Sequence, residues 1–119
     1  MEVINIAEKF SQFSDHWNPK LIGELNGQAV KIAKVKGEFV WHDHKEEDEL
    51  FFVIKGTLQI HFRDELKTIK EGEMIVVPKG VEHKPVAKDE VWLMLFEPMS
   101  TKHTGDIEHT LTQKRLESI

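Results

Sequence analysis

Two stretches of the chain decide its fold: GEFVWHDHKEEDELFFVIKG at residues 37–56 and GEMIVVPKGVEH at residues 72–83. In both, short apolar and aromatic runs are separated by turn-forming residues. The first contains the acidic run at residues 45–48, and the second contains Pro-Lys-Gly at residues 78–80. Short strands joined by such turns are typical of sandwiches and barrels, so the sequence predicts an all-β domain.

The first stretch spaces two histidines and a glutamate so that they can meet. We expect a strand over residues 38–42, and because strand side chains alternate between faces, His42 and His44 are predicted to project to the same side. Glu49 begins the next expected strand, at residues 49–54, and the intervening turn returns its carboxylate towards the histidines. Two imidazoles and one carboxylate on one side can hold a metal ion.

A third histidine reaches the same place from the second stretch. His83 follows Gly80 by three residues, so a neighbouring strand can deliver it after the turn. The chain has no cysteine, so a transition-metal site has to be built from imidazole and carboxylate. The predicted ligands of one divalent ion per chain, whether Zn, Fe, Mn, Ni or Co, are His42, His44, Glu49 and His83.

The histidines and carboxylates could also have purely structural roles that involve no metal. A lone His-x-His pair is more often two surface or core histidines than a metal pair, and adjacent carboxylates in a turn are usually a solvated face. On those grounds we expect the acidic run to be solvated and His61 to point outward from its strand. The remaining histidines are expected to be solvated in loops or the tail: His16, His103 and His109.

The combined spacing of the two stretches resembles the two motifs of the cupin superfamily. The first motif, H-x-H with a following Glu and Gly, is matched by His42, His44, Glu49 and Gly56. The second motif, Gly, P-x-G and His, is matched by Gly72, Pro78, Gly80 and His83. The resemblance implies a double-stranded β-helix, or jelly-roll barrel, and it selects Glu49 over Asp48 as the carboxylate ligand.

Two positions depart from the family pattern. The glycine that usually stands six residues before the first histidine stands five before it, at Gly37, and the asparagine that often ends the second motif is replaced by Ala87. Neither position is a predicted ligand. The chain most resembles small single-domain bacterial cupins often labelled mannose-6-phosphate isomerase-like, and the ending FEPMSTKHTGDIEHT is similar to the closing segment of that group.

Outside the motifs, helical spacing of apolar residues predicts a short amphipathic helix within residues 4–14 that covers an end or edge of the barrel. Asn26-Gly27 between alternating apolar residues predicts a β-hairpin over residues 21–35. Further strands are expected at residues 57–63, 73–77 and 91–96. We expect one cupin domain over residues 1–119, with its core at about 20–98. The tail at 100–119, anchored by Leu111 and Leu116, either packs as an arm or stays mobile.

Composition excludes several classes of protein. A formal charge of -5 and a pI near 5.8 argue against nucleic acid as a partner, because phosphate binding normally needs a basic patch. No apolar run is long enough to span a membrane, and the N-terminus lacks the pattern of a signal peptide. We therefore expect a cytoplasmic protein.

Several functions stay open. The metal site favours an enzyme acting on a small polar substrate, sugar-like or with carbonyl and hydroxyl groups. The alternatives are an Fe(II)-dependent dioxygenase and a non-catalytic module that binds or senses a small ligand. Lys36, Arg63 and Lys84 are the cations that could reach a sugar phosphate, and no residue is assigned as a general acid or base. The strand at 49–54 is apolar on both faces, which predicts a homodimer.

Overall fold

The computed structural model describes residues 1–101, 105 and 116–119. Within these residues one helix is followed by eight strands, which confirms the all-β prediction. Their order is α1 (Ile6–Phe10), β1 (Lys20–Leu25), β2 (Gln28–Glu38), β3 (Glu49–Lys55), β4 (Thr57–Phe62), β5 (Leu66–Lys70), β6 (Met74–Val77), β7 (His83–Pro98) and β8 (Glu117–Ser118).

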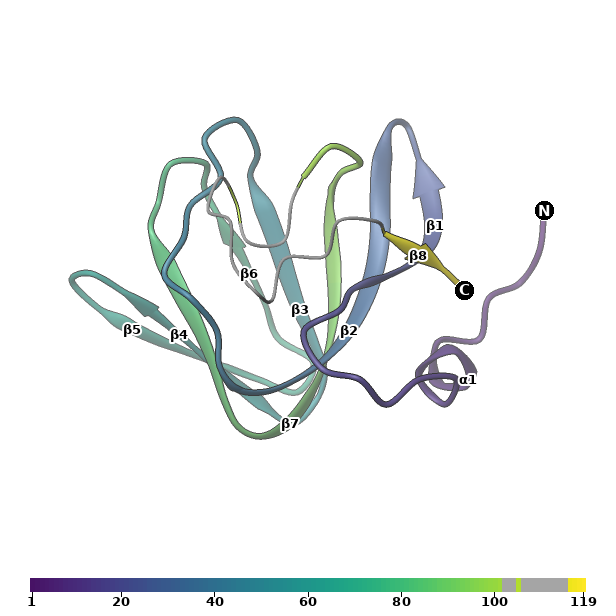
Figure 1. Cartoon of the computed structure of the whole chain (residues 1–119), viewed down its shortest axis with the longest axis horizontal. Helices are drawn as coiled ribbons and strands as arrows, with labels where there is room; N and C mark the ends of the chain where they lie inside the picture. Colours follow the sequence, from purple (N-terminus) through teal and green to yellow (C-terminus); the bar gives the residue numbers. More distant parts are fainter. Residues whose placement is uncertain (102–104, 106–115) are drawn as a thin grey trace.

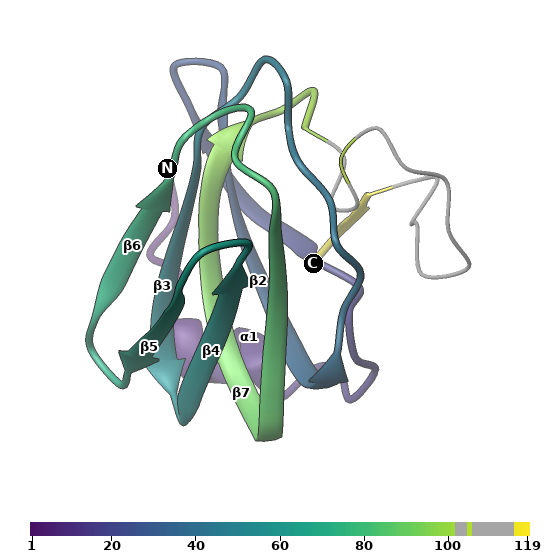
Figure 2. The same cartoon turned by 90° about the vertical axis from the view of Figure 1, so that its left-hand side faces the viewer.

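Strand β7 organises the barrel because two groups of strands share it (Figures 1 and 2). Along one edge it pairs antiparallel with β2 over most of its length. Along the other edge its first residues pair with β4, while its later residues pair with β3. Strand β4 continues to β5, and β3 continues to β6. The chain therefore folds into two facing groups of strands, as the jelly-roll prediction requires.

The space between the two groups holds the main apolar core. Burial alternates along β3 and β7, so every second side chain points inward. The inward residues are mostly branched and fully enclosed, and they are Ala33, Val35, Phe51, Val53, Leu58, Ile60, Ile69, Val77, Ala87, Val91, Leu93 and Leu95. The same inward positions carry Glu49 and His83 at the ends of their strands, so the core and the predicted site share one interior.

Helix α1 covers the outer face of β2, β3 and β7. Phe10 is buried in a second cluster with Ile22 and Ile32, and its ring stacks on Trp92 at 4.7 Å between centroids. This cluster also covers Ile54 of β3, so part of the outward apolar face that suggested a second subunit is covered by the chain itself. The helix spans fewer residues than predicted because Asn5 caps its start, accepting a hydrogen bond from the Glu8 amide at 3.0 Å.

The hairpin at Asn26-Gly27 is confirmed. Strands β1 and β2 pair antiparallel directly across it, and both turn residues have positive φ, as the Asn-Gly signal predicts. Not all of the apolar residues at helical spacing pack inward: Phe10 is buried, whereas Ile4 and Ala7 are exposed.

Three strand predictions need correction. No strand covers residues 38–42, because β2 ends at Glu38 just after an irregularity in its pairing at Gly37, where φ is +85°. Strand β5 was not predicted, since it is a short edge strand with only two apolar residues, Leu66 and Ile69. Strand β7 begins at His83 rather than at residue 91. Its first residues pair with β4, and the strand then continues through an exposed polar run that the sequence analysis did not assign to a strand.

The described end of the tail returns to the sheet. Strand β8 pairs parallel with the start of β1, and Leu116 is half-buried. Leu111, His103 and His109 lie outside the described residues. No helix in the described part of the chain is long and apolar enough to cross a membrane.

Two motif glycines allow a matched test of why the first motif ends in glycine. Both Gly56 and Gly72 have positive φ, but a Cβ on Gly56 would lie 3.1 Å from the Glu90 carbonyl oxygen, whereas a Cβ on Gly72 meets nothing within 4 Å. We expect Gly72→Ala to lower the free energy of unfolding by about 1–2 kcal/mol through backbone strain alone. Gly56→Ala should lose about 1–3 kcal/mol more through overpacking. Urea denaturation of both variants measures this, and equal losses would contradict it.

Candidate metal centre

Two backbone hydrogen bonds join the motifs. The amide of His42 donates to the carbonyl of His83 at 3.0 Å, and the amide of His83 donates to the carbonyl of His42 at 2.9 Å. Beyond Glu38, where β2 ends, the predicted strand at 38–42 keeps this isolated antiparallel bridge and a hydrogen bond from the Phe39 amide to the Pro85 carbonyl at 2.9 Å. The His42 and His44 side chains are therefore placed by a loop held against β7, and not by the alternation of a strand. The Gly80 amide, which donates to the His44 carbonyl at 2.7 Å, fixes the same loop from the second turn.

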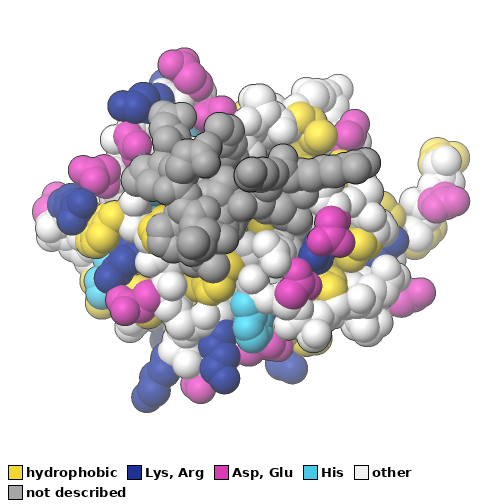
Figure 3. Space-filling view, viewed as in Figure 1, with side chains coloured by type: hydrophobic (Ala, Val, Ile, Leu, Met, Phe, Trp, Pro, Cys, Tyr) yellow, Lys and Arg dark blue, Asp and Glu magenta, His cyan; other side chains and the backbone are white. Residues whose placement is uncertain are grey.

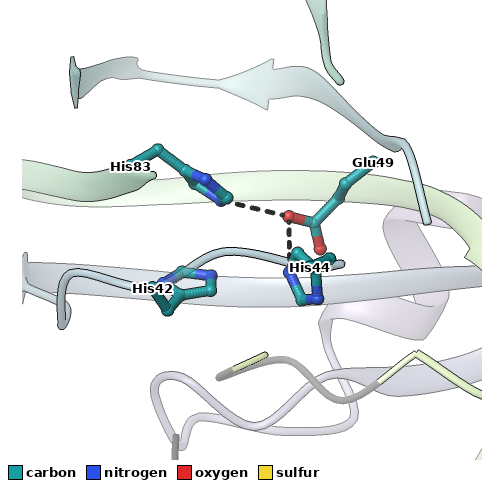
Figure 4. A group of neighbouring side chains, drawn as sticks. All are labelled: His42, His44, Glu49 and His83. Carbon is teal, nitrogen blue, oxygen red and sulfur yellow. Dashed lines mark ion pairs between the residues drawn. The ribbon is translucent and has the colours of Figure 1, made fainter. Parts of the chain in front are cut away.

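The structure brings the four predicted ligands together. One ligand atom from each of His42, His44, Glu49 and His83 lies within 4.8 Å of the others, and all four residues are buried. Figure 4 shows His44 and His83 facing the same carboxylate oxygen of Glu49, Oε1, at 3.4 and 3.5 Å from their Nε2 atoms. The cluster fits a single metal site of three imidazoles and one carboxylate.

Backbone carbonyls orient two of the imidazoles. Nδ1 of His42 donates to the Val40 carbonyl and Nδ1 of His83 donates to the Val81 carbonyl, each at 2.9 Å. Because a carbonyl only accepts, the proton of each neutral ring is on Nδ1 and the lone pair is on Nε2. Backbone carbonyls that fix the tautomer of a histidine are typical partners of metal ligands.

The charge states also suit a cation. Burial alone would raise the pKa of Glu49, but the contacts with His44 and His83 outweigh it and hold that pKa well below its usual range. Burial, helped by the nearby His83, lowers the pKa of His42 to about 4. Oε1 of Glu49 and Nε2 of His83 are buried without a hydrogen-bond partner among the described residues, as expected of donor atoms that face a metal ion.

Two residues beside the site were missed by the sequence analysis. The Lys31 ammonium, on β2, donates to Glu97 Oε1 on β7 at 2.8 Å, and both side chains are almost fully buried. Burial raises the pKa of Glu97 well above its usual value, and the adjacent charge of Glu49 raises it further. Glu97 therefore favours the neutral form, and Lys31 makes a charge-assisted hydrogen bond to it. The sequence did carry a signal for this pair, because a lysine and a glutamate stand at inward-facing positions of otherwise apolar strands.

The other polar residues lie away from the cluster. Asp48 is exposed, and its carboxylate accepts from the Lys79 amide at 2.9 Å, which ties the acidic turn to the second motif. His61 is half-buried on β4, opposite Leu66. The expectation that His16 is simply solvated is wrong in part, because its Nε2 lies 2.7 Å from Glu90 Oε2.

Part of the tail packs on the loop that carries the histidines. Gly105 is buried, has a φ of +66°, and a Cβ there would overlap the carbonyl oxygen of Asp43, between His42 and His44. Only glycine permits so close an approach. At this position the tail packs as an arm against the site.

A small cavity of about 30 Å³ adjoins the cluster. His42 and Glu49 form one part of its wall. The other nine lining residues are apolar, and they include Trp17, Val35, Phe39, Phe51, Leu93 and Leu95.

The chain is thus a small barrel of mostly antiparallel strands, with three histidines and a glutamate gathered in its interior. The family model of the cupin domain matches residues 30–97, more than half of the 119 residues. The chain therefore belongs to the cupin family.

Solved structures agree with this assignment. A cupin-2 domain containing protein from Shewanella frigidimarina is 56% identical, with a TM-score of 0.80 over 81% of this chain and 94% of that one. Protein NMB1881 from Neisseria meningitidis is 34% identical, with a TM-score of 0.76 over 82% of this chain and 99% of that one.

Similarity to curated sequences covers less of each protein. Protein YdbB of Bacillus subtilis is 38% identical over 80 residues, which are 66% of this chain and 65% of YdbB. A protein from Aquifex aeolicus is 35% identical over 69 residues, which are 56% of this chain and 57% of that protein. The matched region spans less than two thirds of each relative.

The low pKa of His42 makes stability of the metal-free protein depend on pH. The unfolded chain binds a proton near pH 6.5 and the folded chain only near pH 4. The contribution of His42 to stability is therefore complete above pH 6.5 and is lost as the pH falls towards 4. Between pH 7 and 4.5 the chelator-treated protein should lose about 2–3 kcal/mol more free energy of unfolding than its His42→Gln variant. Parallel losses in urea titrations of the two proteins would contradict the shift.

The buried pair of Lys31 and Glu97 predicts a second difference in stability. Lys31→Met removes the donor and leaves Glu97 buried without it, so the free energy of unfolding should fall by about 1–3 kcal/mol. The double variant Lys31→Met/Glu97→Met removes both partners and should regain most of that loss. Lys84→Met is the control, because Lys84 makes a surface pair with the exposed Glu38 and should change stability by less than about 1 kcal/mol. Thermal unfolding at fixed pH compares all three variants.

Proposed function

We propose that this cupin binds one divalent transition-metal ion through His42, His44, Glu49 and His83, and acts through it on a small molecule. The observation that carries the proposal is the meeting of four buried donor side chains within 4.8 Å beside a cavity. Three imidazoles and one carboxylate suit Zn, Fe, Mn, Ni or Co, and such a set leaves room for water or substrate in the coordination sphere.

When bound, such an ion supplies Lewis-acid polarisation of a carbonyl or hydroxyl oxygen or, if it is iron, redox chemistry with O₂. The chain's own residues supply position and environment. The bridge between His42 and His83 holds two ligands in register, and Phe39 packs edge-on against the His42 ring at 5.4 Å between centroids. The apolar wall of the cavity limits water beside the donors.

A mannose-6-phosphate isomerase-like activity has less support. Such a substrate needs a cation for its phosphate, and two of the candidates already have partners. Arg63 pairs with Glu82 at 3.0 Å and stacks over Trp41, while Lys84 pairs with Glu38 at 2.8 Å. None of the three predicted cations lines the cavity.

An Fe(II)-dependent dioxygenase is the second candidate, because an apolar cavity beside the metal ligands suits apolar O₂. A hydroquinone 1,2-dioxygenase, PnpCD, solved with Cd²⁺ and 4-hydroxybenzonitrile, has a similar fold at 14% identity, which is a likeness of fold alone. A binding or sensing module without turnover is the third candidate.

The predicted homodimer is also part of the proposal. Strand β6 pairs only with β3 among the described strands, and Met74 and Val76 on it are 57% and 49% exposed. Exposed apolar side chains on an unpaired edge suit a second copy of the chain.

On the face drawn in Figure 3, charged side chains of both signs are spread between apolar ones. The predicted cytoplasmic location stays a prediction.

Elemental analysis tests the metal proposal directly. Protein purified without an affinity tag and reconstituted near neutral pH should retain about one equivalent of a divalent transition metal per chain. His83→Ala should lose most of it, because it removes one of four ligands, while His61→Ala, on the surface of β4, should retain it. Less than about a tenth of an equivalent in the unaltered protein would overturn the proposal.

Turnover separates the candidate functions. Fe-, Mn- and Zn-loaded protein is incubated with pooled sugars, sugar acids and diketones, with and without O₂. Product that disappears in His83→Ala supports an enzyme, and O₂ uptake only with iron supports the dioxygenase. Binding without product supports the module.

A further inference from the structure

The cavity beside the predicted metal site limits what kind of molecule can approach it. Among the described residues that line it, the only polar ones are His42 and Glu49, two of the predicted ligands. A molecule that reached an ion held by these residues from this side would direct its donor atoms toward the ion and its remaining body toward apolar side chains. Polar groups on that body would lose water without gaining hydrogen bonds, which is unfavourable.

One aromatic wall is held rigidly in place. Trp17 has a φ of 62°, a left-handed conformation that is strained for a bulky residue. Its amide donates to the Lys34 carbonyl at 2.9 Å, and its indole N–H donates to the Lys36 carbonyl at 2.8 Å. Its ring stacks on Phe39 at 4.6 Å between centroids. With its one donor already used, Trp17 offers a ligand only an apolar face.

The cations near this interior are also engaged. The buried Lys31 ammonium binds Glu97 Oε1 at 2.8 Å and the Thr101 carbonyl at 3.4 Å. The Lys20 ammonium binds Asp15 and Glu117, each at 2.9 Å. Neither lysine is among the described lining residues. The described wall therefore offers no counter-charge to a phosphate or a second carboxylate.

The size of the cavity sets a further limit. About 30 Å³ is room for roughly two water-sized groups, since one such group needs about 10–15 Å³. A short alkyl group fits within this space, whereas a sugar ring would have to extend beyond it.

Resting on the proposed function, we infer that the site is selective for small oxygen-donor compounds with a short, uncharged alkyl body, such as ketones or hydroxy compounds, over phosphorylated or polyhydroxylated ones. The donor oxygens lie at the end of the cavity formed by His42 and Glu49, toward the ion that these residues would hold. The alkyl group lies among Trp17, Phe39 and Val35.

Three hydroxamates with the same chelating head test this selectivity. Acetohydroxamate carries a methyl tail, glycolohydroxamate a hydroxymethyl tail and phosphoglycolohydroxamate a phosphate. Each is titrated into Co²⁺-loaded protein, and the visible absorption of the ion reports binding. Acetohydroxamate should bind about 10- to 100-fold more tightly than either polar probe, because a buried hydroxyl finds no partner in the cavity. Equal or tighter binding of a polar probe would overturn the inference.

A pair of variants on β2 tests whether the cavity sets the preference. Val35 lines the cavity, whereas Val30 packs on the outer cluster under α1. Val35→Ala should improve binding of butyrohydroxamate relative to acetohydroxamate by about fourfold for each methylene that gains burial, and Val30→Ala should leave the ratio unchanged. Equal changes in both variants would contradict the assigned wall.

The two proposals fail in different ways. Protein that retains Co²⁺ but shows no tail preference overturns only the selectivity. Protein that retains no Co²⁺ after desalting overturns the metal site and the selectivity that rests on it. Circular dichroism of each variant shows whether it is folded. If a variant is not folded, the three hydroxamates titrated into the unaltered protein still test the selectivity.

Discussion

The site depends on one short backbone bridge, the pair of hydrogen bonds between His42 and His83. These residues lie at the start of β7 and in the loop after β2, and forty residues of chain separate them. Because the bonds are made by main-chain atoms, the bridge fixes the two imidazoles without using their ring nitrogens. Those nitrogens remain for the Val40 and Val81 carbonyls on one side and for the site on the other.

The barrel interior contains an apolar core and a cluster of polar side chains. Glu49, His83, Lys31 and Glu97 occupy inward positions of strands whose other inward residues are aliphatic or aromatic. These groups are tolerated there because each has a partner. The Lys31 ammonium donates to Glu97, whose carboxyl favours the neutral form beside the Glu49 carboxylate, and Glu49 itself contacts His44 and His83. Oε1 of Glu49 and Nε2 of His83 are buried without a hydrogen-bond partner among the described residues and lie 3.5 Å apart, which is the physical argument for a cation beside them.

The apolar cavity beside this cluster of polar side chains limits which ligands the proposed site can bind. A buried donor set beside a wall without cations favours ligands that carry their polarity at one end. Membership of the cupin family is compatible with many chemistries, since a fold hosts unrelated functions and the site decides among them. The rigid placement of Trp17 and the hydrogen bond between Lys31 and Glu97 are features of this chain's own residues. They limit the ligands that the site can accept more than membership of the family does.

The sequence by itself determined the strand-rich class, the Asn26-Gly27 hairpin and the four residues of the cluster, because turn chemistry and motif spacing are local properties of the chain. It was wrong about how His42 is held, because it expected an alternating strand where β2 ends at Glu38, just after an irregular pairing at Gly37, and a loop follows. It also missed Lys31 and Glu97. Only the tertiary structure decided these points, because long-range pairing of β2 and β7 brings together side chains 66 residues apart, and no local pattern reports which inward positions of two strands will face each other.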